Sequence, residues 1–186
     1  MRIISGYLKG KKIKLPKDKK TRPLKDLVKE SIFNILVHSN KINCKIENAQ
    51  ILDLFSGSGS FGLECISRGA KKVFFNENYS EALKILNENI NFLRCNDKVK
   101  ILDNDCFNLK NVIEKFSASF DIIFIDPPFK EKKTNTLIET LLDLKLLKEN
   151  GLIILHRKNK EKENLTEKFN IIETRIYGIS KIIFGN

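Results

Sequence analysis

The chain has 186 residues, of which 41% are hydrophobic and 31% charged, as expected of one globular domain with a full core, and its formal net charge is +11. No apolar run approaches the roughly 20 residues of a membrane-spanning helix, and the first residues lack the apolar centre of a signal peptide, so we expect a cytoplasmic protein without a membrane partner. The four cysteines stand singly, without a Cys-x-x-Cys motif, which indicates free thiols and no metal site.

Most of the excess positive charge lies in the first 30 residues, which contain eleven Lys or Arg and three Asp or Glu, a net charge of +8. Two short apolar stretches, 2–4 and 12–15, are separated by glycines and predict a small β-hairpin. A concentrated basic arm suits a polyanionic partner, because neutralised phosphates release counterions. The residues expected to contact nucleic acid here are Arg2, Lys9, Lys11, Lys12 and Lys14. A solvated charged arm is the alternative.

A helix and then an alternation of strands and helices follow the arm. Thr21, as an N-cap, and Pro23 begin a predicted helix whose apolar positions recur at helical spacing up to Leu36. After a polar loop, the alternation predicts a mostly parallel sheet covered by helices. The expected strands are 50–55, 72–75, 99–102, 121–126 and 151–156, with 171–177 and 181–184 as an antiparallel pair. The expected helices are 61–68, 80–93, 108–115, 134–142 and 164–169. We therefore expect one compact domain, 41–186, that carries an N-terminal extension, 1–40.

A glycine-rich loop follows the first strand of the predicted sheet. Gly57, Gly59 and Gly62 fit G-x-G-x-x-G, a loop that lets the backbone approach a nucleotide cofactor closely. Asp53, inside the strand, would repel a pyrophosphate but suits the amino group of a methionine-like ligand. With Phe55 the segment becomes Asp-x-Phe-x-Gly-x-Gly, which indicates a cofactor site.

The tetrapeptide Asp126-Pro127-Pro128-Phe129 ends the fourth predicted strand. Two consecutive prolines cannot donate ladder hydrogen bonds, so the strand stops at Asp126 and a rigid turn follows. In an open α/β sheet this carboxyl end is where ligands bind. A carboxylate, a proline carbonyl and an aromatic face suit a planar base with an exocyclic amine, which offers two N–H donors and a surface for stacking. An ordinary Pro-Pro loop with a packing Phe is the alternative.

These segments together resemble the bacterial RsmD family, which methylates the N2 amine of a guanine in small-subunit (16S) ribosomal RNA. The resemblance covers nearly the whole chain and rests on 2–6 with the Lys-rich hairpin, 21–23 running into 30–34, 53–59 and 126–129. It implies the Rossmann-like α/β fold of class I S-adenosylmethionine-dependent methyltransferases, with a seven-stranded, mostly parallel sheet and an antiparallel C-terminal strand. It also implies S-adenosylmethionine as the cofactor and ribosomal RNA, within the small subunit or its assembly intermediate, as the partner of a monomer.

The resemblance assigns further residues to the cofactor and the substrate. The family's acidic residue that binds the ribose falls on Asn76, with Glu77 next along, so ribose binding could be weaker or rearranged. Asp105, followed by Cys106, fits the residue that contacts the adenine amine, although a role as a helix N-cap is equally consistent. Arg22 would lie near the cofactor mouth and touch the substrate.

In the implied reaction, Asp126 and the Pro127 carbonyl accept the two hydrogens of the guanine amine while Phe129 stacks on the base. Three alternatives stay open: a DNA adenine or cytosine amino methyltransferase, a protein glutamine methyltransferase, and a catalytically inactive RNA-binding assembly factor. The basic arm and the absence of a target-recognition domain argue against the first two. The change of the ribose-binding acid would favour the third. His38 and His156 have no identifiable partner, which favours surface or strand-end roles over catalysis.

Overall fold

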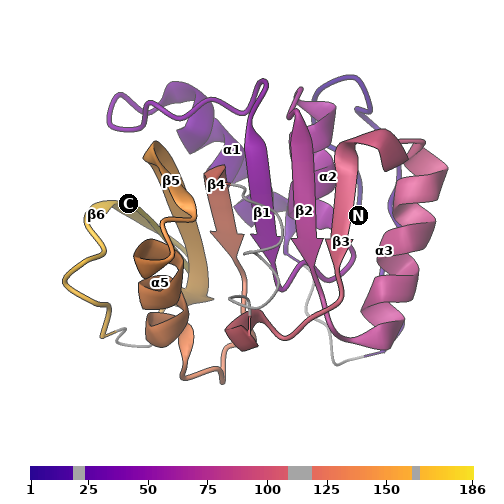
Figure 1. The fold of residues 1–186 in the computed structure, drawn as a ribbon. Helices are drawn as coiled ribbons and strands as arrows, with labels where there is room; N and C mark the ends of the chain where they lie inside the picture. The colour runs from indigo at the N-terminus through magenta and orange to yellow at the C-terminus, as the bar shows by residue number, and fades with distance from the viewer. Residues whose placement is uncertain (19–23, 109–118, 161–163) are drawn as a thin grey trace.

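The computed structural model describes residues 1–18, 24–108, 119–160 and 164–186. Its centre is a seven-stranded sheet with the order β3-β2-β1-β4-β5-β7-β6 (Figure 1). The strands are β1 (Gln50–Leu54), β2 (Lys72–Asn76), β3 (Val99–Leu102), β4 (Phe120–Ile125), β5 (Leu147–Lys158), β6 (Ile171–Tyr177) and β7 (Ser180–Gly185). Strands β1 to β5 are parallel and β7 is antiparallel to both its neighbours, which confirms the predicted fold class.

Helices cover both faces of this sheet. They are α1 (Asp26–His38), α2 (Ser60–Ser67), α3 (Ser80–Leu93) and α5 (Thr134–Asp143), with short 3-10 turns η1 (Asn96–Lys98) and η2 (Cys106–Asn108). The first three pack into one buried cluster and α5 into another, on opposite faces of the sheet. In Figure 1, α5 lies in front of the sheet and α2 behind it. Because both faces are covered, the central strands are almost continuously apolar, which makes them visible in the sequence.

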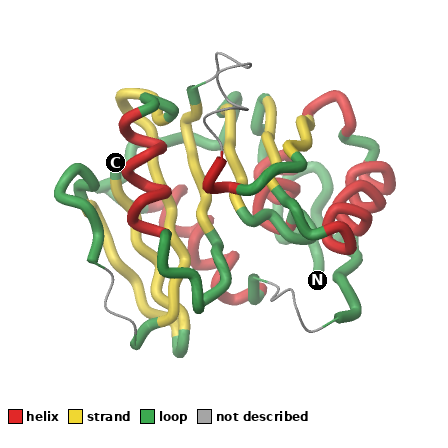
Figure 2. Tube along the Cα trace, turned by 60° about the horizontal axis from the view of Figure 1, so that its bottom comes forward, coloured by secondary structure: helices red, strands yellow, loops and turns green. Residues whose placement is uncertain are grey.

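The strand order reverses between β1 and β4, and this reversal positions the functional loops. Leu54 of β1 is level with Ile125 of β4, so both strands end together and the loops after them begin side by side. The arrowheads of β1, β2 and β4 point to one edge of the sheet in Figure 1, and Figure 2 brings that edge forward. In open α/β sheets such a reversal point forms the ligand crevice.

The N-terminal hairpin is fastened to α2 by a buried carboxylate. Glu64 is fully buried and accepts hydrogen bonds from the backbone N–H groups of Ile4 at 2.7 Å and Ser5 at 2.9 Å. Gly6 has φ +80°, and an added Cβ would lie 1.8 Å from the Ser67 carbonyl oxygen, so only glycine allows this approach. The basic arm therefore sits firmly on the helix that follows the glycine loop.

Lys29 of α1 completes this junction. Its ammonium, fully buried, donates to the Arg2 carbonyl at 2.8 Å and to the Ser60 hydroxyl at 3.3 Å, and lies 3.9 Å from the Glu64 carboxylate. Burial lowers the pKa of Lys29, whereas the carboxylates of Glu64 and Asp26 oppose this shift. A buried ammonium is tolerated only when it is paired, so α1, the hairpin and α2 hold one another in place.

Two predictions for the N-terminal extension are modified. The hairpin forms, but Arg2 and Lys12 make its one antiparallel bridge within the described chain, so neither side is long enough to be a strand. Helix α1 begins at Asp26, because the backbone of Lys25 is extended. Thr21, its predicted N-cap, lies outside the described residues.

Most other predicted elements agree within one residue, except β5, which is longer at both ends. The helix predicted over 164–169 is wrong: the Phe169 N–H donates to the Thr166 carbonyl in a turn, and a segment this short cannot sustain a helix alone. The helix predicted over 108–115 lies outside the described residues apart from Asn108, the last residue of η2. All four cysteines are buried free thiols, as predicted. Within the described residues, no helix has the length and apolar character to cross a membrane.

Candidate active site

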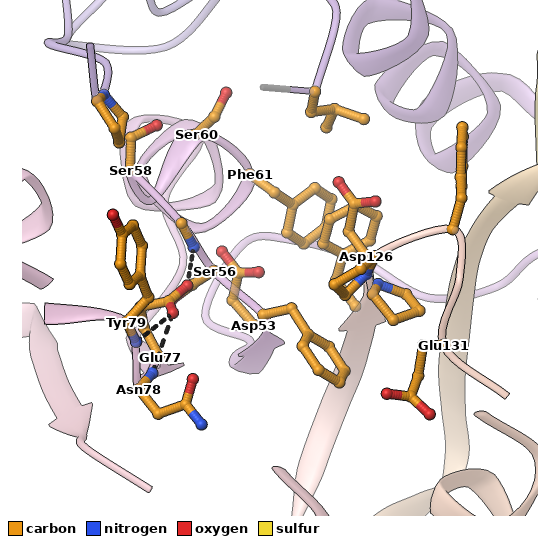
Figure 3. A pocket seen from close by; sticks show the side chains of 18 of the residues that line it. Asp53, Ser56, Ser58, Ser60, Phe61, Glu77, Asn78, Tyr79, Asp126 and Glu131 are labelled. Carbon is orange, nitrogen blue, oxygen red and sulfur yellow. Dashed lines mark hydrogen bonds between the residues drawn. The ribbon is translucent and has the colours of Figure 1, made fainter. Parts of the chain in front are cut away.

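A cavity of about 550 Å³ opens at the carboxyl edge of the sheet, among the loops that follow β1, β2, β3 and β4. The glycine loop and the Asp-Pro-Pro-Phe turn, far apart in the chain, line this one cavity. Figure 3 shows Asp53 at the centre of the lining, with Glu77 on one side and Asp126 on the other. The predicted site residues that line it are Asp53, Phe55, Gly57, Glu77, Asp105, Asp126, Pro127, Pro128 and Phe129.

Asp53 is a buried carboxylate with one unsatisfied oxygen. Its Oδ2 accepts the Gly62 N–H at 3.0 Å, while Oδ1 has no hydrogen-bond partner among the described residues. Burial raises the pKa of Asp53 well above its ordinary value; the Gly62 N–H opposes the shift, and the Asp126 and Glu77 carboxylates add to it. A buried oxygen of this kind is an acceptor that a ligand N–H would satisfy.

The loop after β1 is shaped by glycine and by one strained aromatic residue. Gly59 has φ +82°, and an added Cβ would lie 2.5 Å from the Leu86 side chain, so this residue shapes the loop although it does not line the cavity. Phe55 also has a left-handed backbone, with φ 60°, a conformation that costs about 1 kcal/mol or more for a residue with a side chain. Its ring packs edge-on against Phe107 with 6.2 Å between centroids. Strain of this kind commonly marks a ligand site.

Glu77 presents the acidic side chain at the end of β2. Its carboxylate accepts the backbone N–H groups of Gly57 at 2.7 Å, Tyr79 at 2.9 Å and Asn78 at 3.0 Å, as the dashed lines in Figure 3 show. The carboxylate thereby ties the loop after β1 to the loop after β2. Since a carboxylate offers about four acceptor positions, one remains for a ligand hydroxyl.

The prediction that Asn76 lies in the ribose site is corrected. Asn76 is fully buried, does not line the cavity, and donates from Nδ2 to the Asn104 carbonyl and the Cys106 sulfur, both at 2.9 Å. Successive residues of a strand point to opposite sides, so the last residue of β2 turns inward and Glu77 turns to the cavity.

Asp105 and Cys106, which are also neighbours, differ in the same way: only the first lines the cavity. Asp105 lines the cavity, and its Oδ1 also accepts the Phe107 N–H at 3.0 Å, so the predicted capping role is present at a position that could also meet a ligand. Cys106 does not line the cavity, which corrects its predicted place in the cofactor site. Burial raises the pKa of its thiol to about 12. Cys106 is a packing residue beneath the loop.

Asp126 is held by a histidine whose role the sequence did not reveal. His156, which is 2% exposed, places Nδ1 2.8 Å from Asp126 Oδ1 and Nε2 2.9 Å from Ser180 Oγ. The Phe129 ring meets the imidazole edge-on at 5.7 Å. Ile125 pairs with Leu155 in the register, which makes the residues after them neighbours. The contact between His156 and Asp126 could have been predicted only from this pairing of β4 with β5, and no local sequence pattern reveals that pairing.

Arg157, the next residue of β5, holds the backbone of the turn. It is buried, and its guanidinium donates to the carbonyls of Pro128 at 3.3 Å, Phe129 at 3.4 Å and Glu131 at 2.9 Å. In the described parts of the chain, no hydrogen bond is donated to the carbonyl of Pro127, the acceptor predicted for the substrate amine. Arg157 thus holds the turn at three carbonyls, and the carbonyl predicted to accept from the substrate amine is not one of them.

The residues predicted to contact RNA are exposed along the hairpin, namely Arg2, Lys9, Lys11, Lys12 and Lys14. Lys14 pairs with Glu88 of α3 at 2.8 Å, so its charge is partly neutralised. Arg22 lies outside the described residues. Leu15 and Pro16, where the hairpin ends, line the cavity, so the basic arm leads to its mouth.

Comparison with known proteins supports one family. A family model described as "Conserved hypothetical protein 95" matches residues 1–186. Ribosomal RNA small subunit methyltransferase D of Haemophilus influenzae is 32% identical over 96% of this chain and 90% of its own. A solved Haemophilus influenzae structure, described as a "putative methylase", is 29% identical with a TM-score of 0.77 over 99% of this chain and 96% of that one. A more distant methyltransferase structure complexed with SAH, 18% identical over 81% of this chain and 48% of that one with a TM-score of 0.63, shows the fold alone. The chain belongs to the RsmD family, that of ribosomal RNA small subunit methyltransferase D.

Proposed function

We propose that this protein transfers a methyl group from S-adenosylmethionine to the exocyclic N2 amine of a guanine in small-subunit ribosomal RNA. The observation that carries the proposal is the one cavity lined by both the glycine loop and the Asp-Pro-Pro-Phe turn. Family membership supports ribosomal RNA as the substrate, because the Haemophilus influenzae relative is named for methylation of ribosomal RNA. The chemistry of the turn supports an amine as the acceptor of the methyl group.

The polar groups of the cavity fit S-adenosylmethionine. The unsatisfied Asp53 Oδ1 would accept from the amino group of the methionine moiety. Glu77, held by backbone N–H groups, would accept a ribose hydroxyl. Phe55 and Phe107 offer apolar surface to the adenine, and Asp105 offers an acceptor for its amine.

When bound, S-adenosylmethionine supplies a methyl group on a positively charged sulfur. The guanine amine is a weak nucleophile, because its lone pair is delocalised into the ring. Asp126 and the Pro127 carbonyl would accept its two hydrogens, which favours a pyramidal nitrogen and aims the lone pair at the methyl carbon. Both acceptors also stabilise the positive charge that develops on the nitrogen. Phe129 would stack on a flipped or single-stranded base, so that much of the rate comes from alignment.

We assign RNA binding to the extension, 1–40, and the chemistry to 41–186. The exposed basic side chains of the hairpin and its approach to the cavity mouth support this division. The alternative of an inactive assembly factor depended on Asn76 as the ribose-binding residue. Because Glu77 supplies an acid to the cavity, that reason no longer applies.

The test is methylation of ribosomal RNA and small subunits from cells that lack this protein, with mass spectrometry of the nucleosides. We expect N2-methylguanosine at one site, formed only with active protein. Duplex and single-stranded DNA of equal length serve as controls for the DNA amine methyltransferase. Methylation of DNA but not RNA, or of adenine or cytosine, would contradict the proposal.

A further inference from the structure

We propose that His156, together with Ser180, positions the Asp126 carboxylate for methyl transfer. This inference rests on the proposed function, because it needs Asp126 as the acceptor of the substrate amine. Its basis is the chain of contacts Ser180–His156–Asp126, with 2.9 Å and 2.8 Å between the bonded atoms.

Three strands hold the components of this chain in place. Asp126 follows β4, His156 lies in β5 and Ser180 begins β7, so the contact depends on the centre of the sheet. The side chain of His156 is 3% exposed and that of Asp126 is 11% exposed, so the imidazole is screened from solvent while the carboxylate lines the cavity. Closely packed side chains on strands orient a functional group more precisely than side chains on loops do.

The hydrogen bonds select one form of the neutral imidazole. A carboxylate at Nδ1 requires a donor, so the proton lies on Nδ1, and Nε2 then accepts the hydroxyl hydrogen of Ser180. With the proton on Nε2 instead, a ring lone pair would face the Asp126 carboxylate. The Asp126 carboxylate, which can only accept, therefore selects the form that donates to its Oδ1, and the Ser180 hydroxyl, which can donate or accept, holds the imidazole at Nε2.

The surroundings of His156 favour this role. Within the described residues, His156 contacts Asp126 after β4, Ser180 on β7 and the Phe129 ring. Arg157, next to it on β5, points its guanidinium at the carbonyls of the turn.

The experiment compares His156→Leu with His156→Asn in the full chain. Leucine fills the space without a donor, whereas the asparagine amide can donate to Asp126 from the position of Nδ1. We expect kcat to fall about 10- to 100-fold in the leucine variant, and asparagine to restore it to within about fivefold of wild type at pH 8. The affinity for SAH should stay unchanged in both variants. The same substitutions at the exposed His38 are the matched control.

Two results would overturn the inference. One is a leucine variant with wild-type kcat. The other is an asparagine variant whose kcat is as low as that of the leucine variant, as for a residue that merely packs. Asp126→Ala, assayed in parallel, separates the two proposals. If it is inactive while His156→Leu is unaffected, only the positioning role fails, whereas normal turnover of Asp126→Ala means that the proposed function fails. Should the leucine variant not fold, the kcat of the asparagine variant decides alone, and a value more than about fivefold below wild type overturns the inference.

Discussion

The two halves of the cavity are built in different ways. In the half proposed to bind the cofactor, residues 53–79, the Asp53 and Glu77 carboxylates accept backbone N–H groups 1 to 20 positions away in the chain. In the substrate half, residues 126–131, the turn is held by the side chains of His156 and Arg157, 26 to 30 positions away. The first half needs only β1 and β2 to pair, whereas the second also needs β5 beside β4. Substitutions in the first half should therefore affect cofactor binding, and substitutions in the second half should affect methyl transfer.

The largest effect is expected from Asp126→Ala in the substrate half. Loss of the acceptor for the amine should lower kcat by about a thousandfold or more, while calorimetry with SAH gives an affinity within a fewfold of wild type. Asp143→Ala, on the exposed face of α5, is the matched control. An equal loss of SAH affinity would show that the halves are not separate.

Asp53→Asn tests the cofactor half, where SAH affinity and not kcat should be the quantity that falls. It removes a buried charge that would accept the cofactor's amino group, so SAH affinity should fall about 10- to 100-fold. At saturating cofactor, kcat should recover to within a fewfold of wild type, because the turn is untouched. Titration calorimetry and kinetics at several cofactor concentrations measure both values. A kcat that stays low at saturation would contradict the division.

The basic hairpin belongs to neither half and should affect RNA alone. Lys11→Gln with Lys12→Gln is expected to weaken RNA binding by about 3- to 10-fold and to reduce the slope of log affinity against log salt by about 1 to 2. SAH affinity should not change. Lys41→Gln with Lys45→Gln, exposed in the loop before β1, is the control pair. Equal losses of RNA affinity in both double variants would indicate that only the number of positive charges matters and not their position.

The smallest effect concerns the stability of the cofactor half without ligand. The raised pKa of Asp53 means that the folded protein keeps this proton to higher pH than the unfolded chain. Stability is therefore full below the unfolded value of about 4 and decreases as the pH rises toward the folded value. Asp53→Asn cannot ionise, so its Tm relative to wild type should rise with pH, by roughly 2–4 °C for each kcal/mol. A Tm difference independent of pH would show that the pKa of Asp53 is the same in the folded protein and in the unfolded chain.

Local patterns were sufficient where a residue's task depends on its own segment. The buried strands, the glycine loop and the Pro-Pro turn could be predicted, because covered parallel strands are apolar and glycine and proline restrict the backbone directly. Local patterns failed where a shift of one residue along the chain changes which side chain faces the cavity. Asn76 and Glu77 are neighbours, and only the end of β2 determines which of them faces the cavity. The prediction of a helix over 164–169 is wrong for a related reason, since so short a helix needs stabilisation by tertiary packing, which its own sequence cannot supply.

By itself, the sequence determined the fold class, through the alternation of strands and helices, and the two loops that line the cavity, because each loop follows from spacing within a single strand–loop unit. Only the tertiary structure decided that Asp126 has His156 and Ser180 behind it and that Arg157 holds the turn. Those contacts depend on the register of β4, β5 and β7. Register results from the packing of the whole sheet, and no local pattern in the chain encodes it.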